Sequence, residues 1–143
     1  MAESKASAFW EGDLMSGKGK TSTASGILKD AMLSWKARAE GSSTNTTPEE
    51  LLASAHASCF SMALAHGLAQ GGHKPTRLET SCVVTFGPKP GGFEIKSSAL
   101  TVKGTVPGID EAAFKKAAEE AKAGCPVSAA LKIQMSVSAS LAK

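Results

Sequence analysis

The sequence predicts an α+β fold in which an antiparallel sheet packs on a long central helix. Residues 51–68 contain no Asp, Glu, Lys or Arg and directly follow strong helix-start signals. The segments on either side alternate apolar and polar residues and are separated by glycine-rich turns, which is the pattern of half-buried strands. The resulting order is three strands, a helix, two strands, a helix and a strand, and it is typical of the α+β class.

The N-terminal part and the central helix have distinct signals. Thr47 suits the helix N-cap, Pro48 the first helical position and Glu50 the third position after the cap. The helix should end before Gly71 and Gly72, because consecutive glycines break helices. Ahead of it we expect three strands, the turn SGKGK before the second of them, and the loop GSSTNTT; the strands cover residues 7–12, 21–28 and 33–40.

The part of the chain after the central helix completes a single domain. The second long helix should bury Phe114, Ala117, Ala118 and Ala121, which share one face. No internal repeat and no long linker is visible, so we expect one domain over residues 1–143. The expected elements are strands over 77–86 and 93–106 joined by GPKPGG, a helix over 110–123, a short helix starting at Pro126, and a strand over 132–141.

Composition argues against several classes of function. The formal net charge is +3 and no basic run exceeds Lys115–Lys116, so a nucleic-acid or membrane-surface role has little support. Residues 51–68 are about long enough to span a membrane, but His56, His66 and several Ser and Gly dilute their hydrophobicity. The N-terminus MAESKASAFWEGD lacks the apolar stretch of a signal peptide, and three cysteines are an odd number. We therefore expect a cytoplasmic protein.

The central helix is apolar on all sides. Leu52, Met62 and His66 lie on the side of Cys59, whereas Phe60 and Leu64 lie on the opposite side. A helix of this kind must be covered all round, and so small a chain would struggle to enclose it. We expect a homodimer that buries this helix.

The three thiols differ in their surroundings. Cys59 lies within the central helix, where it is either a packed core residue or a nucleophile. Cys125 lies at a helix N-terminus, where free N–H groups and the helix dipole favour a thiolate, although a simple capping residue remains the alternative. Cys82 lies in an alternating strand and is interpreted as structural.

Arg38 and Glu49 are the charged residues of most interest. The chain has fourteen Lys but only two Arg, so an Arg marks a site that uses its planar fork of donors. Arg38 falls on the polar side of the predicted strand over 33–40, where a solvated side chain is the alternative. Glu49 has no local partner and is free to pair with Arg38. No metal site is expected, because His56, Cys59 and His66 share a helical stripe without a close ligand pair.

Five motifs together resemble the OsmC family of osmotically inducible proteins, which are related to the organic hydroperoxide resistance (Ohr) proteins. They are WEGDL…GKGKTSTASG, RAEG, TPEELLASAHASCFSMAL, VPGID and AGCPVS, in that order. The resemblance implies a thiol peroxidase that reduces organic hydroperoxides, and hydrogen peroxide less readily, in oxidative and hyperosmotic stress. It also implies an intertwined homodimer with two active sites at the subunit interface, and no metal or prosthetic group.

The resemblance also implies roles for individual residues. Cys59 corresponds to the peroxidatic thiol and Cys125 to the resolving thiol, and the two form a disulfide that an external dithiol of lipoyl type reduces. Arg38 and Glu49 correspond to the pair that activates the first thiol. Ala39 and Thr47 depart from the family pattern without touching a reacting group. We expect apolar walls that favour organic peroxides, formed by Leu52, Phe60 and Met62.

Two questions about the site and two alternative functions stay open. On one straight helix about 15 Å of rise separates Glu49 from Cys59, so either the helix begins after Glu49, or Arg38 bridges the gap, or Glu49 serves the other subunit. Helix-terminus reasoning makes Cys125 the more acidic thiol, whereas the resemblance gives that part to Cys59. The alternative functions are a thiol redox sensor and a dimer that binds a hydrophobic ligand. The roles of His56 and His66 are open.

Overall fold

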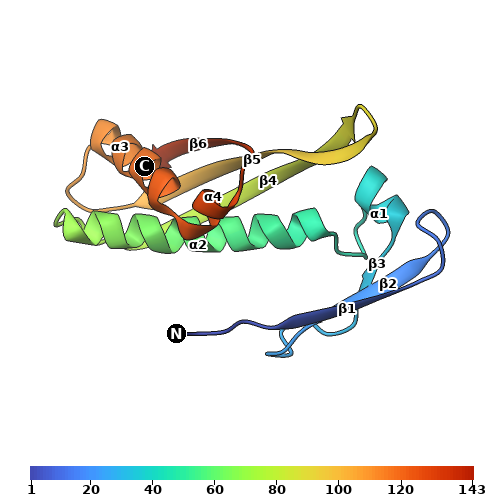
Figure 1. The fold of residues 1–143 in the computed structure, drawn as a ribbon. Coiled ribbons are helices and arrows are strands. Elements are labelled where there is room, and N and C mark those ends of the chain that lie inside the picture. The colour runs from blue at the N-terminus through green and yellow to red at the C-terminus, as the bar shows by residue number, and fades with distance from the viewer. The chain divides into compact units, whose positions relative to one another are not determined.

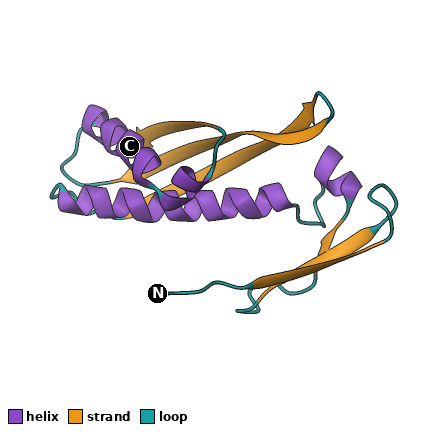
Figure 2. Ribbon diagram, viewed as in Figure 1, coloured by secondary structure: helices purple, strands orange, loops and turns teal.

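The structure is a computed structural model that describes residues 1–143, and it contains two compact units, residues 1–51 and 52–143. Each unit has its own three-stranded sheet (Figures 1 and 2). The predicted α+β class is confirmed. Helix α2 (Pro48–Gln70) runs from one unit into the other without a break, and the expectation of a single domain over residues 1–143 stays a prediction.

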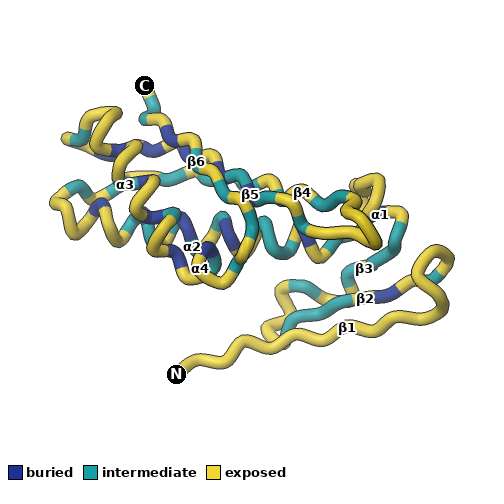
Figure 3. Tube along the Cα trace, turned by 45° about the horizontal axis from the view of Figure 1, so that its top comes forward, coloured by how far each residue is buried: buried dark blue, intermediate teal, exposed yellow.

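The first unit is an antiparallel sheet with one short helix. Its strands are β1 (Ala6–Glu11), β2 (Lys18–Thr23) and β3 (Ala31–Leu33), paired in that order, and helix α1 (Trp35–Glu40) follows. Strand β2 begins inside the predicted SGKGK turn, and its Gly19 packs directly against the Phe9 carbonyl, where no Cβ would fit. Every residue of β1 is exposed within the chain (Figure 3).

The predicted strand over residues 33–40 is wrong, because most of it is helix α1. The Ser34 hydroxyl caps the helix by accepting a hydrogen bond from the Ala37 backbone N–H at 3.1 Å. Ala, Lys, Arg and Glu, the residues that follow Trp35, are all good helix formers. Their alternation of apolar and polar types imitates a strand over so short a segment. Arg38 therefore lies in the last turn of a helix.

The ends of α2 are the predicted ones. The Thr47 hydroxyl accepts a hydrogen bond from the Glu50 backbone N–H at 3.0 Å. The Glu50 carboxylate accepts one from the Thr46 hydroxyl at 2.7 Å instead of reaching back to the cap. At the other end, Gly72 has a φ of +85° and the His73 N–H bonds back to the Leu68 carbonyl at 2.8 Å, which closes the helix.

The second unit packs α2 and α3 on one face of a sheet. The sheet order is β4-β5-β6, with β4 and β5 antiparallel and β5 and β6 parallel. The parallel pair differs from the all-antiparallel expectation, because the connection through α3 and α4 returns the chain before β6 begins. The elements are β4 (Arg77–Lys89), β5 (Gly92–Thr105), α3 (Glu111–Gly124), α4 (Pro126–Ala130) and β6 (Gln134–Leu141).

The core lies between this sheet and the two long helices. Phe60, Leu64 and Leu68 of α2 are almost completely buried there, together with Phe114 of α3. The predicted apolar face of the second long helix is confirmed, with Phe114, Ala118 and Ala121 buried. The β4–β5 hairpin pairs up to Lys89 and Gly92, so its turn is shorter than the predicted GPKPGG.

Helix α2 is covered on one side only. Met62, on the side opposite the core, is 68% exposed. By length and composition α2 could cross a membrane, with a mean hydropathy of 1.2 and 22% of its apolar window buried within the chain. One side of α2 is buried and the other is exposed, as expected for a core helix whose second side is not covered by its own chain. The homodimer that would cover this face stays a prediction.

Candidate active site

Cys59 and Cys125 lie next to each other within one chain. Cys125 is fully buried in the core of the second unit, and the partly buried Cys59 packs against that core. Both are free thiols, and each affects the pKa of the other, so the two side chains lie within range of interaction. Within one chain the two thiols therefore lie close together, and their roles as a site stay a prediction.

The turn between α3 and α4 directs Cys125 inward. Cys125 ends α3, with its N–H donating to the Ala121 carbonyl at 2.9 Å, and it is also the N-cap residue of α4. Its backbone is extended, with φ −67° and ψ 125°, and Pro126 starts the new helix. This change of direction turns the sulfur of Cys125 toward α2, where Cys59 lies.

The two thiols have opposite pKa shifts. Burial raises the pKa of the Cys59 thiol, and its interaction with Cys125 raises it further, while the Val127 backbone N–H opposes both. Burial also acts to raise the pKa of Cys125, but Cys59, Ser128 and the Val127 N–H outweigh it and leave that pKa below its ordinary value. Within the second unit Cys125 is therefore the more acidic thiol, as its position at the start of a helix predicted.

Arg38 and Glu49 form a bidentate salt bridge within the first unit. Arg38 Nη2 lies 2.8 Å from Glu49 Oε1, and Arg38 Nε lies 3.0 and 3.2 Å from the two carboxylate oxygens. Glu49 is 6% exposed, so the carboxylate is held in a nearly dry position. The pairing of Arg38 with Glu49 is present. Because α2 begins at Pro48, the explanation that the helix starts after Glu49 is excluded.

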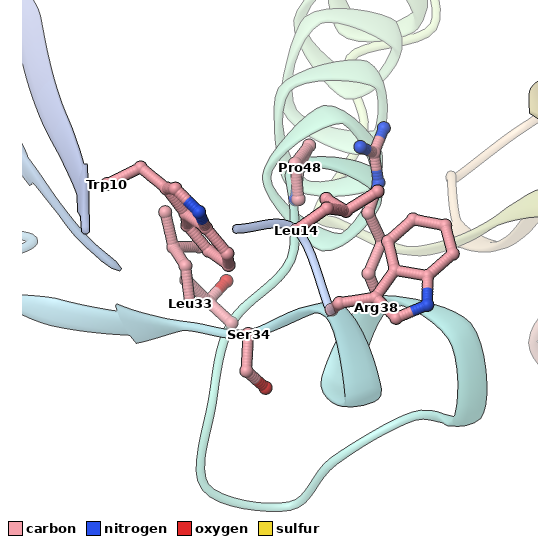
Figure 4. A pocket seen from close by; sticks show the side chains of 8 residues that line it. Trp10, Leu14, Leu33, Ser34, Arg38 and Pro48 are labelled. Atoms are coloured by element: carbon pink, nitrogen blue, oxygen red, sulfur yellow. The ribbon is translucent and has the colours of Figure 1, made fainter. Parts of the chain in front are cut away.

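Arg38 also lines an apolar pocket in the first unit. The pocket holds about 160 Å³, and Figure 4 shows Trp10, Leu33 and Arg38 among its walls. Sequence reasoning missed this pocket. The chain contains two tryptophans, Trp10 and Trp35, both of which line it, and their scarcity was the available signal. Its remaining walls come from Leu14, Ser34, Trp35, Thr46 and Pro48.

The three residues expected to form apolar walls are in different environments. Phe60 is completely buried in the core of the second unit. Leu52 is half-buried, and Met62 is strongly exposed. Their role toward a substrate stays a prediction.

His56 is a residue whose importance the sequence left open. It is completely buried, with its Nδ1 2.6 Å from the Ser98 hydroxyl and its Nε2 2.7 Å from the Ser128 hydroxyl. Burial lowers the pKa of His56, which favours the neutral form of the ring. His66, on the same helix, is exposed. No three His, Cys, Asp or Glu side chains are grouped so as to hold a metal ion.

A protein-family model described as OsmC-like protein matches residues 40–140 of this chain. Peroxiredoxin OsmC of Escherichia coli (strain K12) is 44% identical over 133 residues, which cover 93% of this chain and 92% of that protein. The chain belongs to the OsmC family. The resemblance inferred from the five sequence motifs is confirmed.

Other members of this group are more distant. The organic hydroperoxide resistance protein of Xanthomonas axonopodis pv. citri (strain 306) is 34% identical over 98 residues, 68% of this chain and 67% of that protein. The crystal structure of the organic hydroperoxide resistance protein OhrB of Bacillus subtilis matches with a TM-score of 0.71 and 24% identity, and the match covers 96% of this chain and 98% of that one. The structural likeness supports the OsmC-type fold. The named relatives support a peroxidase-type enzyme in this family member.

Proposed function

We propose that this OsmC-family protein is a cysteine peroxidase that reduces organic hydroperoxides to alcohols, and hydrogen peroxide more weakly. The observation that carries the proposal is that the free thiols of Cys59 and Cys125 lie against the same buried core within one chain, where each affects the pKa of the other. Two adjacent free thiols, one partly accessible and one buried, are the arrangement that a peroxidatic and a resolving cysteine need.

The proposed reaction has three balanced steps. The Cys59 thiolate attacks one peroxide oxygen, the O–O bond breaks, and the alkoxide takes up a proton to leave as an alcohol, while Cys59 becomes a sulfenic acid. The Cys125 thiolate then attacks the Cys59 sulfur, an S–S bond forms, and the oxygen leaves as water. An external dithiol, of lipoyl type, reduces the disulfide and is itself oxidised to a disulfide.

The first step needs a cation at Cys59. Burial raises the pKa of this thiol, and a guanidinium group would reverse that effect and stabilise the departing alkoxide. We assign this role to Arg38, whose direction the Glu49 carboxylate holds through the two-pronged pair. Two explanations of how the Arg38–Glu49 pair acts on Cys59 stay open. Either Arg38 bridges part of the distance between Glu49 and Cys59, or the pair acts on the Cys59 of the other subunit.

The assembly and the cellular setting are part of the same proposal. The exposed apolar side of α2 supports a homodimer with two active sites at the subunit interface. We propose a cytoplasmic enzyme that needs neither a metal nor a prosthetic group. Apolar walls formed by Leu52, Phe60 and Met62 would favour a bulky organic peroxide over a small polar one.

The deciding experiment follows peroxide and thiols together. Wild-type protein should consume cumene hydroperoxide in the presence of a dithiol, and mass spectrometry after one equivalent of peroxide should find Cys59 linked to Cys125 with Cys82 still reduced. Cys59→Ser should abolish consumption, and full turnover by this variant would refute the assignment. Disulfide formation without recycling by any dithiol would favour the redox sensor, and inert thiols would favour the ligand-binding dimer.

A further inference from the structure

A buried histidine joins three elements around the thiol pair. His56 lies on α2, and its two ring nitrogens contact Ser98 on β5 and Ser128 on α4, partners that are 42 and 72 residues away in sequence. Both contacts are short, at 2.6 and 2.7 Å, and all three side chains are buried. None of the three steps of the proposed peroxidase reaction uses this histidine.

The contacts continue beyond the histidine at both ends. The Cys82 sulfur on β4 lies 3.1 Å from the Ser98 hydroxyl oxygen. At the other end, Ser128 lies in the first turn of α4, three residues after the N-cap Cys125, and its side chain acts to lower the pKa of the Cys125 thiol. These side chains form what we call the His56 chain, which runs through Cys82, Ser98, His56, Ser128 and Cys125.

The donors and acceptors of the His56 chain have only two consistent directions. When Cys125 is a thiolate, the Ser128 hydroxyl must donate to it, so this hydroxyl must accept from His56 Nε2–H. His56 Nδ1 is then an acceptor, the Ser98 hydroxyl donates to it, and Ser98 accepts from the Cys82 thiol. When Cys125 is a thiol that donates to Ser128, every bond reverses and the histidine carries its proton on Nδ1.

We propose that His56 is a positioning residue for Cys125: through Ser128 it ties α4 to α2, and it changes tautomer whenever Cys125 gains or loses its proton. This inference rests on the proposed function, in which Cys125 closes the disulfide. Holding α4 against α2 keeps the Cys125 sulfur within reach of Cys59 during the reaction.

The chemistry of imidazole suits this position better than that of any amide. A neutral imidazole exchanges donor and acceptor between its two nitrogens without moving the ring. A glutamine or asparagine in the same place would offer one fixed donor end and one fixed acceptor end. Such a side chain could satisfy only one of the two states of Cys125. Besides His56, the titratable groups of the His56 chain are the thiols of Cys82 and Cys125, and the thiol of Cys59 interacts with Cys125.

The first experiment reads the tautomer directly and needs no peroxide. In full-length Cys59→Ser protein with ¹⁵N-labelled histidine, the proton of His56 should move from Nδ1 to Nε2 over the pH range in which ultraviolet absorbance shows Cys125 ionising. The matched control is Cys59→Ser with Cys125→Ser, in which no exchange should occur. An unchanged His56 spectrum during Cys125 ionisation would overturn the proposal, and so would an exchange that survives in the control.

The second experiment separates the two chemical steps. Ser128→Ala should leave the rate of Cys59 oxidation by cumene hydroperoxide within about twofold of wild type, since Ser128 acts on Cys125. It should raise the pKa of Cys125 by about one unit and slow disulfide closure at neutral pH about tenfold, which is the usual effect of losing one hydrogen bond to a charged group. Ser128→Thr, which keeps the hydroxyl, should restore closure.

The control and the contrary outcomes are distinct from those of the peroxidase proposal. Ser136→Ala removes an exposed hydroxyl of β6 and should behave like wild type. Closure at the wild-type rate in Ser128→Ala would refute the positioning role while leaving the peroxidase intact. A wild-type Cys59 that does not react with peroxide would refute the peroxidase, and the tautomer experiment would still decide the role of His56.

Discussion

Arg38 and Glu49 are joined by two parallel contacts, Nη2 to Oε1 at 2.8 Å and Nε to Oε2 at 3.2 Å. This geometry uses the planar fork of the guanidinium, which a lysine does not have. The last turn of α1 and the first turn of α2 supply the two residues, so a local arrangement of two helix ends fixes the direction of the cation.

Replacement of the planar guanidinium of Arg38 by the ammonium group of a lysine should impair peroxide reduction. Arg38→Lys keeps the charge but loses one of the two prongs, so we expect kcat/KM for cumene hydroperoxide to fall about 10- to 100-fold. Arg77→Lys is the matched control, because Arg77 forms an exposed pair with Glu79. Equal activity of the two variants would show that the fork has no role in the reaction.

The cap of α1 should matter for activity as well as for stability. Ser34→Ala removes the hydroxyl that accepts from the Ala37 N–H, which should cost about 1 kcal/mol in the free energy of unfolding. Fraying of α1 would also loosen Arg38, so peroxide reduction should fall with it. Ser34→Asp supplies another capping oxygen and should preserve both properties in urea unfolding and in the activity assay. Loss of activity in Ser34→Asp to the level of Ser34→Ala would contradict this account.

Stability should fall as the pH drops below the ordinary pKa of histidine. Burial lowers the pKa of His56, so below about pH 6.5 the unfolded chain binds a proton that the folded protein does not. The folded state then loses up to about 1.4 kcal/mol per pH unit until the folded pKa is reached. Urea unfolding between pH 7.5 and 5 measures this slope, which should be smaller in His56→Gln. An unchanged slope in that variant would rule out His56 as its source.

The exposed side of α2 should be a subunit interface. Met62 and Val83 have similar exposure within the chain, 68% and 63%, but Val83 lies on β4. Met62→Glu would place an unpaired charge in the interface, so we expect the dimer dissociation constant to rise at least 100-fold by sedimentation. Val83→Glu should leave assembly unchanged. A wild-type protein that sediments as a monomer would refute the dimer outright.

Local signals in the sequence determined the elements whose ends and faces depend on nearby residues. Thr47, Pro48 and the Gly71–Gly72 pair set the limits of α2, and the spacing of Phe114, Ala118 and Ala121 set the buried face of α3. The prediction for residues 35–40 was wrong, because their alternation of apolar and polar types resembles a strand, whereas they form a helix capped by the Ser34 hydroxyl. The family motifs were equally local, and from them both cysteines were predicted as site residues.

Only the tertiary structure decided which side chains meet. The contact of Cys125 with Cys59 depends on the chain reversal between α3 and α4, and the contacts of His56 join residues 42 and 72 positions apart. The parallel pairing of β6 with β5 likewise depends on how the α3–α4 connection crosses the sheet. Sequence periodicity indicates the face of a helix or strand on which a side chain lies. Contacts between residues that are distant in sequence produce no pattern in either segment alone. The pKa shifts of the thiols follow from those partners: burial acts to raise the pKa of Cys125, and Cys59 and Ser128 outweigh it.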